Sequence, residues 1–284
     1  MPAIPRNASS RFSMQKINVG LIGCGTIGSA LAKVLLKDFQ QQVSFVGISE
    51  IQPERARRFM RKFKKKIPLL SIDKLIQKCD LILEAASSSV SASIAAETLR
   101  RGKQVLIMSV GGLLGDQKKR FRLSGKSGGR IWIPSGALAG IDGLLAANEG
   151  KIRKVKLVTE KPPASLREAP YFRRHRFPVI EGSRPICLFK GNALQAVQGF
   201  PQNINVAAIL SLAGLGPQKT QVEIWTSRRF RTNRHRILIE GDFGRIETLT
   251  ENIPSKENPK TSALAVHSAV ACLRKIFSPF RIGT

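Results

Sequence analysis

The 284-residue sequence has few aromatic and few acidic side chains. Aromatic residues make up 6% of it, and 19 acids stand against 47 lysines and arginines, which gives a formal net charge of +28. Such a charge favours nonspecific, salt-sensitive contact with nucleic acid. Proteins that recognise particular nucleic-acid sequences use an aromatic-studded basic groove or a DNA-reading motif, and this chain shows neither. We therefore expect such contact to lack sequence preference.

Long hydrophobic runs are absent as well. No stretch of 18 or more apolar residues occurs, so no transmembrane helix and no membrane partner are expected. The first 13 residues, MPAIPRNASSRFS, lack the apolar core of a secretory signal. We expect them to form an extension, with the folded part beginning near Met14.

The cysteines are few and scattered. They form no CxxC pair and lie near no histidine cluster, so neither a disulfide framework nor a metal site is supported. We expect all of them to be buried packing residues of a protein in the reducing cytoplasm. They are Cys24, Cys79, Cys187 and Cys272.

The basic residues are spread over the chain, and their densest block is RARRFMRKFKKK, from Arg55 to Lys66. Phe59, Met60 and Phe63 recur within it at helical spacing. The pattern predicts an amphipathic helix with a solvated basic face. A nucleic-acid surface is the alternative interpretation of the same residues.

Up to Pro134, short apolar runs alternate with amphipathic helical patterns. This alternation with short loops predicts a parallel, doubly wound sheet with right-handed crossovers. The expected strands are 17–23, 43–49, 81–87, 104–110 and 130–134. One helix is expected directly after the first strand, in GCGTIGSALAKVLLK, and others at 55–66, 72–79, 91–99 and 117–123.

After Pro134 the pattern changes to strands with polar residues at alternate positions, at 152–159, 222–226 and 235–240. Such strands predict an open antiparallel or mixed sheet with one solvated face. The proline-rich segment 162–185 is expected to be a loop with at most one helical turn. Residues 263–277 form an amphipathic helix capped by Thr261 or Ser262.

The strongest motif is Gly23-x-Gly25-x-x-Gly28, placed where the first strand ends and a helix begins. Gly23 makes the tight turn, Gly25 lets a pyrophosphate approach the backbone, and Gly28 lets helix and strand pack closely. The unpaired N–H groups of the helix N-terminus then face the phosphates. The motif predicts a Rossmann-type dinucleotide site.

Glu50 follows the second strand, at the distance from the glycines where an acid binds the adenosine ribose. A carboxylate there favours NAD and repels the 2′-phosphate of NADP. Arg55, Arg57 and Arg58 follow closely and can soften this preference, so NADP stays open as a second cofactor.

Three histidines can move protons near neutral pH. His175 lies in a basic loop and is expected to be solvated, and His267 lies inside the last helix, where a core or surface role is expected. His235 begins a strand in the second half of the chain. Pattern alone leaves a catalytic and a structural role open for it.

Four further runs carry a resemblance to the L-aspartate dehydrogenase family, in the order that the family has them. Together with the glycine motif they extend from about Ile17 to Phe277. The runs are PSGA at 134–137 with GID at 140–142, KPP at 161–163, FPQNINVA at 200–207 and ENIPSKENPKTS at 251–262.

This resemblance implies that L-aspartate is oxidised with NAD or NADP to iminoaspartate, which water converts to oxaloacetate and ammonia. It implies that His235, in the step Asn233-Arg234-His235, is the catalytic histidine. It also implies cofactor contacts by Ala137 and Asn205, for which the residues alone suggest a turn and a helix cap. Members of the family are often homodimers.

A dicarboxylate substrate requires cationic donors, and Lys161 is a candidate, with Asn233 as a second substrate contact. The chain departs from the family at Ser227, since members usually carry Ala-Asp-Pro shortly before the histidine and this chain has Thr-Ser-Arg. Without that acid, and with arginines nearby, a lowered histidine pKa is expected. The departure leaves two hypotheses, an active enzyme with altered pH behaviour and a divergent copy that still binds NAD.

We therefore predict an α/β protein with a Rossmann-type doubly wound parallel sheet and a second α+β domain that carries an open mixed sheet. The dinucleotide-binding domain is placed at 1–134, completed by the C-terminal helix at 262–284, and the substrate and catalytic domain at 135–261. Two alternatives stay open. One is another two-domain dehydrogenase or reductase of amino-acid pathways, and the other is a basic non-catalytic protein that binds dinucleotide or nucleic acid.

Overall fold

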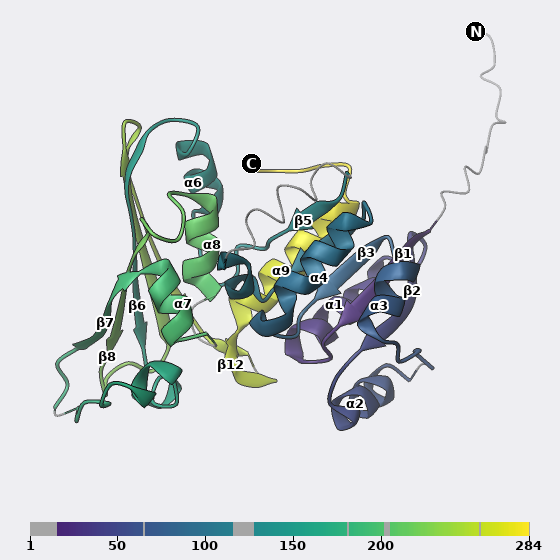
Figure 1. The fold of residues 1–284 in the computed structure, drawn as a ribbon, viewed down its shortest axis with the longest axis horizontal. Helices are drawn as coiled ribbons and strands as arrows, with labels where there is room; N and C mark the ends of the chain where they lie inside the picture. The colour runs from purple at the N-terminus through teal and green to yellow at the C-terminus, as the bar shows by residue number, and fades with distance from the viewer. Residues whose placement is uncertain are drawn as a thin grey trace, which may run out of the picture.

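The computed structural model describes residues 16–64, 66–115, 128–180, 182–201, 205–255 and 257–283. Two sheets, each with its own helices, lie side by side along the long axis of the molecule (Figure 1). The expected N-terminal extension and the expected helix at 117–123 fall outside the described residues. Within those ranges, no helix is long and apolar enough to cross a membrane.

Sheet A is parallel throughout and has the strand order β2-β1-β3-β4-β5. Its strands are mostly apolar because helices cover both faces. The order reverses between β1 and β3, which is where a doubly wound sheet opens a crevice at its carboxyl edge. This confirms the predicted Rossmann-type sheet. The strands are β1 (Ile17–Ile22), β2 (Val43–Ser49), β3 (Leu81–Glu84), β4 (Gln104–Ile107) and β5 (Arg130–Trp132).

Helices α1 (Thr26–Asp38) and α9 (Ala263–Phe277) pack on one face of sheet A, where Leu31 of α1 and Leu273 of α9 are buried in the same core. Helices α3 (Ile72–Lys78) and α4 (Ser88–Arg100) cover the other face. The last helix of the chain therefore belongs to the core of the first sheet. Its N-cap position is held by Ser262.

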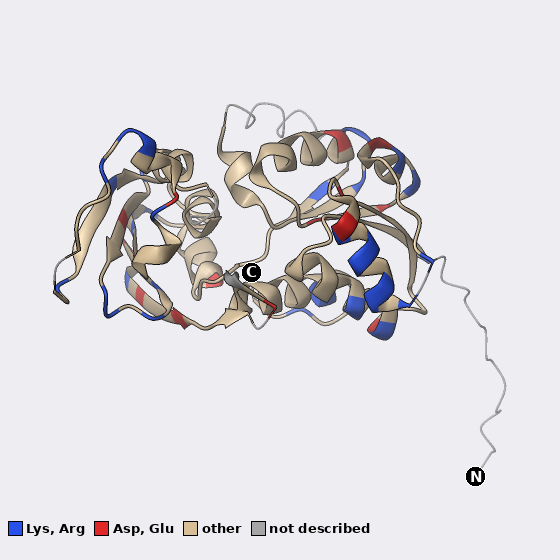
Figure 2. Ribbon diagram, turned by 90° about the horizontal axis from the view of Figure 1, so that it is seen from below, with Lys and Arg blue, Asp and Glu red and all other residues tan. Residues whose placement is uncertain are grey.

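The predicted basic helix is α2 (Pro53–Phe63), which buries Ala56 and Phe59 and ends where Lys64 adopts a left-handed conformation. Its lysines and arginines are exposed, and Figure 2 shows how closely they follow one another along the helix. The expected strand 104–110 is shorter than predicted. It ends at Ile107 because residues Val110–Leu114 form a 3-10 turn, η1.

Sheet B is mixed, as predicted, with the strand order β10-β9-β6-β8-β7. The β6–β8 pair is parallel and the other pairs are antiparallel. Two of its strands, β7 and β10, have no counterpart among the predicted ones. Both are edge strands. β7 begins with an unbroken apolar run, and in β10 the apolar Leu249 lies on the exposed face, so neither shows the apolar–polar alternation of the predicted strands. The strands are β6 (Ile152–Lys161), β7 (Ile186–Asn192), β8 (Gln221–Thr226), β9 (Asn233–Gly241) and β10 (Gly244–Asn252).

Three helices cover the inner face of sheet B, α6 (Ile141–Ala147), α7 (Ala193–Gly199) and α8 (Asn205–Ala213) (Figure 1). Helix α8 is buried on two sides. Leu210 packs into the core of sheet B, whereas Ile209 packs into the core shared with α3 and α4 of sheet A. Helix α8 therefore packs between the two sheets and connects their cores.

The connections differ from expectation in two respects. The loop 162–185 contains two short 3-10 turns, η3 (Pro163–Ser165) and η4 (Pro170–Arg173), instead of at most one. A small hairpin of β11 (Pro254–Ser255) and β12 (Asn258–Ser262) leads from sheet B into α9. Of the four cysteines, Cys187 is exposed and Cys272 partly so, which contradicts the expectation that all are buried.

Candidate active site

The glycine-rich turn has the geometry that a dinucleotide site needs. Gly23 has a φ of +95°, and a Cβ there would lie 2.4 Å from the Ala85 carbonyl oxygen. A Cβ at Gly28 would lie 2.1 Å from the Gly23 carbonyl oxygen, so α1 approaches the turn as closely as backbone allows. At Gly25 a Cβ would meet no atom within 4 Å. The backbone at Gly25 is therefore open to a phosphate.

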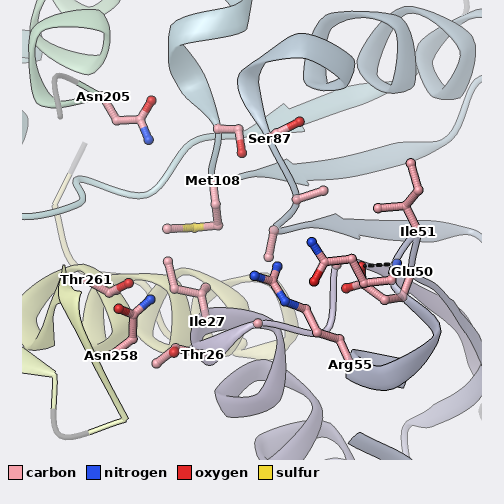
Figure 3. Close-up of a pocket in the computed structure, with 16 residues that line it drawn as sticks. Thr26, Ile27, Glu50, Ile51, Arg55, Ser87, Met108, Asn205, Asn258 and Thr261 are labelled. Atoms are coloured by element: carbon pink, nitrogen blue, oxygen red, sulfur yellow. Dashed lines mark hydrogen bonds between the residues drawn. The ribbon is translucent and has the colours of Figure 1, made fainter. Parts of the chain in front are cut away.

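A cavity of 430 Å³ lies beside this turn, at the carboxyl ends of β1, β2, β3 and β4 (Figure 3). Glu50 lies at one end and Asn205 and Thr261 at the other. The lining residues are Gly23, Gly25, Thr26, Ile27, Glu50, Ile51, Gln52, Arg55, Ala85, Ala86, Ser87, Met108, Ser109, Asn205, Asn258 and Thr261.

The Glu50 carboxylate is fixed by backbone donors. One oxygen accepts a hydrogen bond from the Cys24 N–H at 2.8 Å, and the other accepts one from the Gln52 N–H at 2.9 Å. These bonds hold the acid at the cavity edge next to the glycine turn. Its remaining lone pairs can accept hydrogen bonds from the hydroxyls of a ribose.

Arg55 reaches into the same cavity from α2 (Figure 3). Its neighbours on the basic helix are engaged elsewhere, since Arg57 pairs with Glu54 and Lys62 pairs with Glu257. Among the described residues, no carboxylate lies within ion-pair distance of the Arg55 guanidinium. The cavity therefore offers both an acid and a guanidinium at the end where Glu50 lies.

Glu84, which the sequence interpretation overlooked, is fully buried at the end of β3. Its carboxylate accepts hydrogen bonds from the N–H groups of Ala86 (2.8 Å), Ser109 (3.0 Å) and Met108 (3.2 Å). Burial raises the pKa of this carboxyl, and the N–H donors oppose the rise. Because the donors line the cavity, Glu84 ties the two loops after β3 and β4 together. An acid that ends an apolar strand is the signal that could have identified it.

A second cavity, of 190 Å³, lies between the two sheets. It shares Ile27, Met108, Asn205 and Thr261 with the first, so the two cavities adjoin. Residues from β6, β9 and α8 and the turn at 134–137 meet there. The lining residues are Ile27, Ile107, Met108, Val110, Pro134, Gly136, Ala137, Lys161, Asn205, Val206, Ile209, Asn233, His235, Thr261, Ser262 and Ala265.

His235 is 3% exposed and lines this second cavity from β9. Its Nδ1 lies 2.8 Å from the hydroxyl oxygen of Thr159 on β6. Burial, with a further contribution from Lys161, lowers the pKa of the His235 imidazole to about 3, so the ring is neutral at physiological pH. His175 and His267 are exposed, and neither lines this cavity.

Lys161 enters the cavity from the end of β6 and is 5% exposed. Burial lowers the pKa of its ammonium group to about 8. No carboxylate of the described part of the chain pairs with this group. A buried cation without an acidic partner is costly unless a ligand supplies the opposite charge. The position therefore suits an anionic ligand.

Ala137 and Asn205 border the cavity in ways that their sequence context did not indicate. The Ala137 carbonyl accepts hydrogen bonds from the Thr250 hydroxyl at 2.9 Å and the Asn252 side-chain amide at 3.2 Å. The Asn205 side-chain oxygen accepts one from the Gly111 N–H at 3.1 Å. Asn205 thus links α8 to η1 of the other sheet.

Ser227 lines neither cavity. It is buried, and its hydroxyl donates to the Ser183 carbonyl oxygen at 2.9 Å. The expected effect of nearby arginines on His235 also needs correction. Arg234 and Arg236 alternate with His235 along β9 and pair with acids on the opposite face of the sheet. The low pKa of His235 comes from burial and Lys161 instead.

A glycine-rich turn under one cavity and a buried histidine and lysine in the adjoining one define a two-domain nicotinamide-dinucleotide-dependent dehydrogenase. Residues 23–131 match the family described as "Homoserine dehydrogenase, NAD binding domain", and residues 142–276 match "Aspartate dehydrogenase, C-terminal". The fold is similar to that of the aspartate dehydrogenase of Thermotoga maritima, with a TM-score of 0.71 at 23% identity over 95% of this chain and 100% of that one.

Full-length relatives are more specific. The chain is 37% identical to L-aspartate dehydrogenase 3 of Bordetella bronchiseptica, over 96% of this chain and 99% of that protein. It is 38% identical to the L-aspartate dehydrogenase of Bradyrhizobium diazoefficiens, over 97% of both. The chain belongs to the L-aspartate dehydrogenase family and is an NAD(P)-dependent oxidoreductase.

The first prediction concerns cofactor preference. We expect wild type to bind NADH more tightly than NADPH, and Glu50→Ala to weaken NADH relative to NADPH by about tenfold, because hydrogen bonds to a charged group contribute about 1.5–3 kcal/mol. Arg55→Ala should weaken NADPH selectively, since its guanidinium can face a 2′-phosphate. Fluorescence titration measures both affinities.

Arg57→Ala is the matched control, because Arg57 pairs with Glu54 and does not line the cavity. It should leave both affinities unchanged. A wild-type preference for NADPH, with no response to Glu50→Ala, would show that Glu50 does not bind the ribose.

Proposed function

We propose that this chain oxidises L-aspartate with NAD or NADP to iminoaspartate, which water converts to oxaloacetate and ammonia. The observation that supports this most is the cavity that adjoins the dinucleotide cavity. It holds a neutral His235 and a Lys161 that pairs with no acid of the described residues. We assign dinucleotide binding to residues 1–134 with 262–284, and substrate handling to residues 135–261.

The first cavity fits a dinucleotide on the evidence of its own residues. Gly23, Gly25 and the N-terminus of α1 would hold the pyrophosphate, and Glu50 the adenosine ribose. Asn205 and Ala137 would border the nicotinamide end, because Asn205 lines both cavities and Ala137 the second. The bound cofactor supplies the hydride acceptor for the substrate Cα–H.

The second cavity would hold the substrate by charge and hydrogen bonds. The Lys161 ammonium would pair with one carboxylate of aspartate, and the Asn233 amide would donate to the substrate from the end of β9. Desolvation strengthens such an ion pair relative to one in water. In this arrangement the amine-bearing carbon would lie between the cofactor and His235.

His235 would carry the proton transfers. Because Nδ1 faces Thr159, Nε2 is the ring nitrogen left for the substrate. As a neutral base it can accept the proton that the amine loses as Cα gives up its hydride. After this proton has passed to solvent, the ring can accept a second proton from the water that attacks the imine carbon. Its low pKa keeps the base form present throughout the physiological pH range.

We predict that His235→Ala lowers kcat for L-aspartate by about 10²–10⁴-fold, the usual contribution of general acid–base catalysis. NADH affinity should change little, because His235 does not line the dinucleotide cavity. NADH production from L-aspartate and from a panel of other amino acids measures this.

The exposed histidines serve as controls, and His175→Ala and His267→Ala should retain wild-type turnover. Full turnover by His235→Ala would remove the proton-transfer assignment. A wild-type chain that binds NADH but oxidises no amino acid would instead favour the divergent-copy hypothesis, and a better amino acid than aspartate would favour another dehydrogenase.

Lys161 generates a pH prediction. A lysine is charged below its pKa, so with a pKa of about 8 its attraction for a dicarboxylate is present below pH 8 and lost above it. Affinity for the unreactive dicarboxylate succinate should fall by up to roughly tenfold per pH unit as the pH rises beyond 8. Calorimetry from pH 6.5 to 9.5 measures this affinity.

Lys161→Met should bind succinate weakly and without this pH dependence. Lys154→Met, on the other face of the same strand, should behave like wild type, because Lys154 pairs with Glu240 outside the cavity. A pH dependence that persists in Lys161→Met would assign it to another group.

We also infer a homodimer formed through the outer face of sheet B, which points away from sheet A. On this face lysines and arginines pair with acids, whereas the chain as a whole carries +28. Local charge balance lets two such faces meet without repulsion. The pairs are Lys154–Glu240, Lys156–Glu223, Arg234–Glu160, Arg236–Glu247 and Arg245–Glu247.

The excess positive charge lies elsewhere, with a concentration on the outer side of α2 (Figure 2). This side would make nonspecific contact with nucleic acid through its arginines. The four cysteines are free thiols, which is consistent with a cytoplasmic location.

Sedimentation velocity tests both the homodimer and the nucleic-acid contact. We expect a species of twice the 31.2 kDa chain mass that persists at high salt, and co-sedimentation with oligonucleotides of any sequence at low salt. The double variant Arg58→Glu with Arg61→Glu should weaken the binding of oligonucleotides without changing the dimer. A monomer at micromolar concentration contradicts the dimer, and nucleic-acid binding that survives high salt contradicts the nonspecific contact.

A further inference from the structure

We infer that Thr159 is the positioning residue of His235. It holds the imidazole through Nδ1 in one orientation and one tautomer, with Nε2 turned toward the substrate cavity. This inference rests on the proposed function, because it concerns the residue assigned there to proton transfer. No pattern in the sequence points to Thr159. The resemblance to the family draws attention instead to position 227, where members usually carry an acid and this chain has Ser227.

The contact between the two side chains is built into sheet B. Thr159 on β6 pairs directly with His235 on β9 in the antiparallel register, so both side chains leave the sheet on the same face. The hydroxyl oxygen lies 2.8 Å from Nδ1, and both residues are buried. Across the described ranges, this is the one hydrogen bond made by the Thr159 hydroxyl.

The hydroxyls of Thr250 and Ser227 are committed elsewhere. Thr250, which pairs with His235 from β10, donates its hydroxyl to the Ala137 carbonyl at 2.9 Å. The Ser227 hydroxyl donates to Ser183. The orientation of the ring therefore depends on Thr159.

A hydroxyl at this position has a consequence that a carboxylate would not have. It can accept the Nδ1–H hydrogen bond without adding a charge. Lys161 lies two residues further on β6, on the same face as Thr159. A carboxylate beside it would neutralise the ammonium that we assign to the substrate. Thr159 thus fixes the imidazole while Lys161 remains available.

The test compares three variants. Thr159→Val keeps the branched shape and removes the hydroxyl, and we expect kcat to fall by about tenfold or more while NADH affinity and the KM for L-aspartate stay within about twofold. Thr159→Ser should restore most of kcat. Thr220→Val is the matched control, since Thr220 is equally buried but bonds the Gly216 carbonyl away from both cavities.

Long-range ¹⁵N–¹H NMR of the histidine rings supplies a readout that a purely structural role would not change. In wild type we expect a single tautomer of the His235 ring, and in Thr159→Val a mixture of both tautomers. A mixture in wild type overturns the inference, whether or not Thr159→Val folds. So do wild-type kcat in Thr159→Val and a Thr159→Ser variant as slow as Thr159→Val.

These outcomes are distinct from failure of the proposed function. If His235→Ala retains aspartate turnover, the assignment of His235 to catalysis fails, although the tautomer can still prove to depend on Thr159. If His235→Ala is inactive and Thr159→Val is fully active with an unchanged tautomer, the proposed function stands and the positioning role fails.

Discussion

The packing of α8 against two different cores is the constraint on which the site depends. Ile209 belongs to the core beside sheet A and Leu210 to the core beside sheet B, so the helix cannot leave either without exposing apolar surface. Asn205, at its first residue, bonds η1 of the other half and lines both cavities. The distance between the dinucleotide and substrate cavities is therefore set by a packed helix and not by a flexible linker.

Electrostatics inside the molecule differ from those of its surface. A chain with a net charge of +28 places one lysine and no carboxylate among the described residues that line the inner cavity. Burial lowers the pKa of both titratable groups there. It keeps the His235 imidazole neutral and makes the Lys161 ammonium easier to deprotonate. Under the proposed function, a substrate carboxylate would supply the opposite charge and so offset the cost of burying this lysine.

Much of the first half could be predicted because its signals are local. Apolar strands, amphipathic helices and the glycine motif each act over a few residues, and Glu50 lies where the motif places it. Strands β7 and β10 were not predicted because their residues do not alternate between apolar and polar: β7 begins with an apolar run, and β10 exposes the apolar Leu249. Glu84 and Thr159 were overlooked for another reason. Their importance lies in what they contact, residues 24 and 76 positions away, and no short pattern records such contacts.

The sequence by itself determined the doubly wound sheet, the dinucleotide turn and, through its resemblance to a family, the histidine at 235. These follow from local periodicity, from backbone conformations open to glycine and from runs of residues that can be compared directly. The tertiary structure alone decided that Ser227 turns away, that Thr159 faces the imidazole and that Lys161 is buried without an acid. The physical reason is that strand register and burial, which set hydrogen-bond partners and pKa values, arise when distant strands pair.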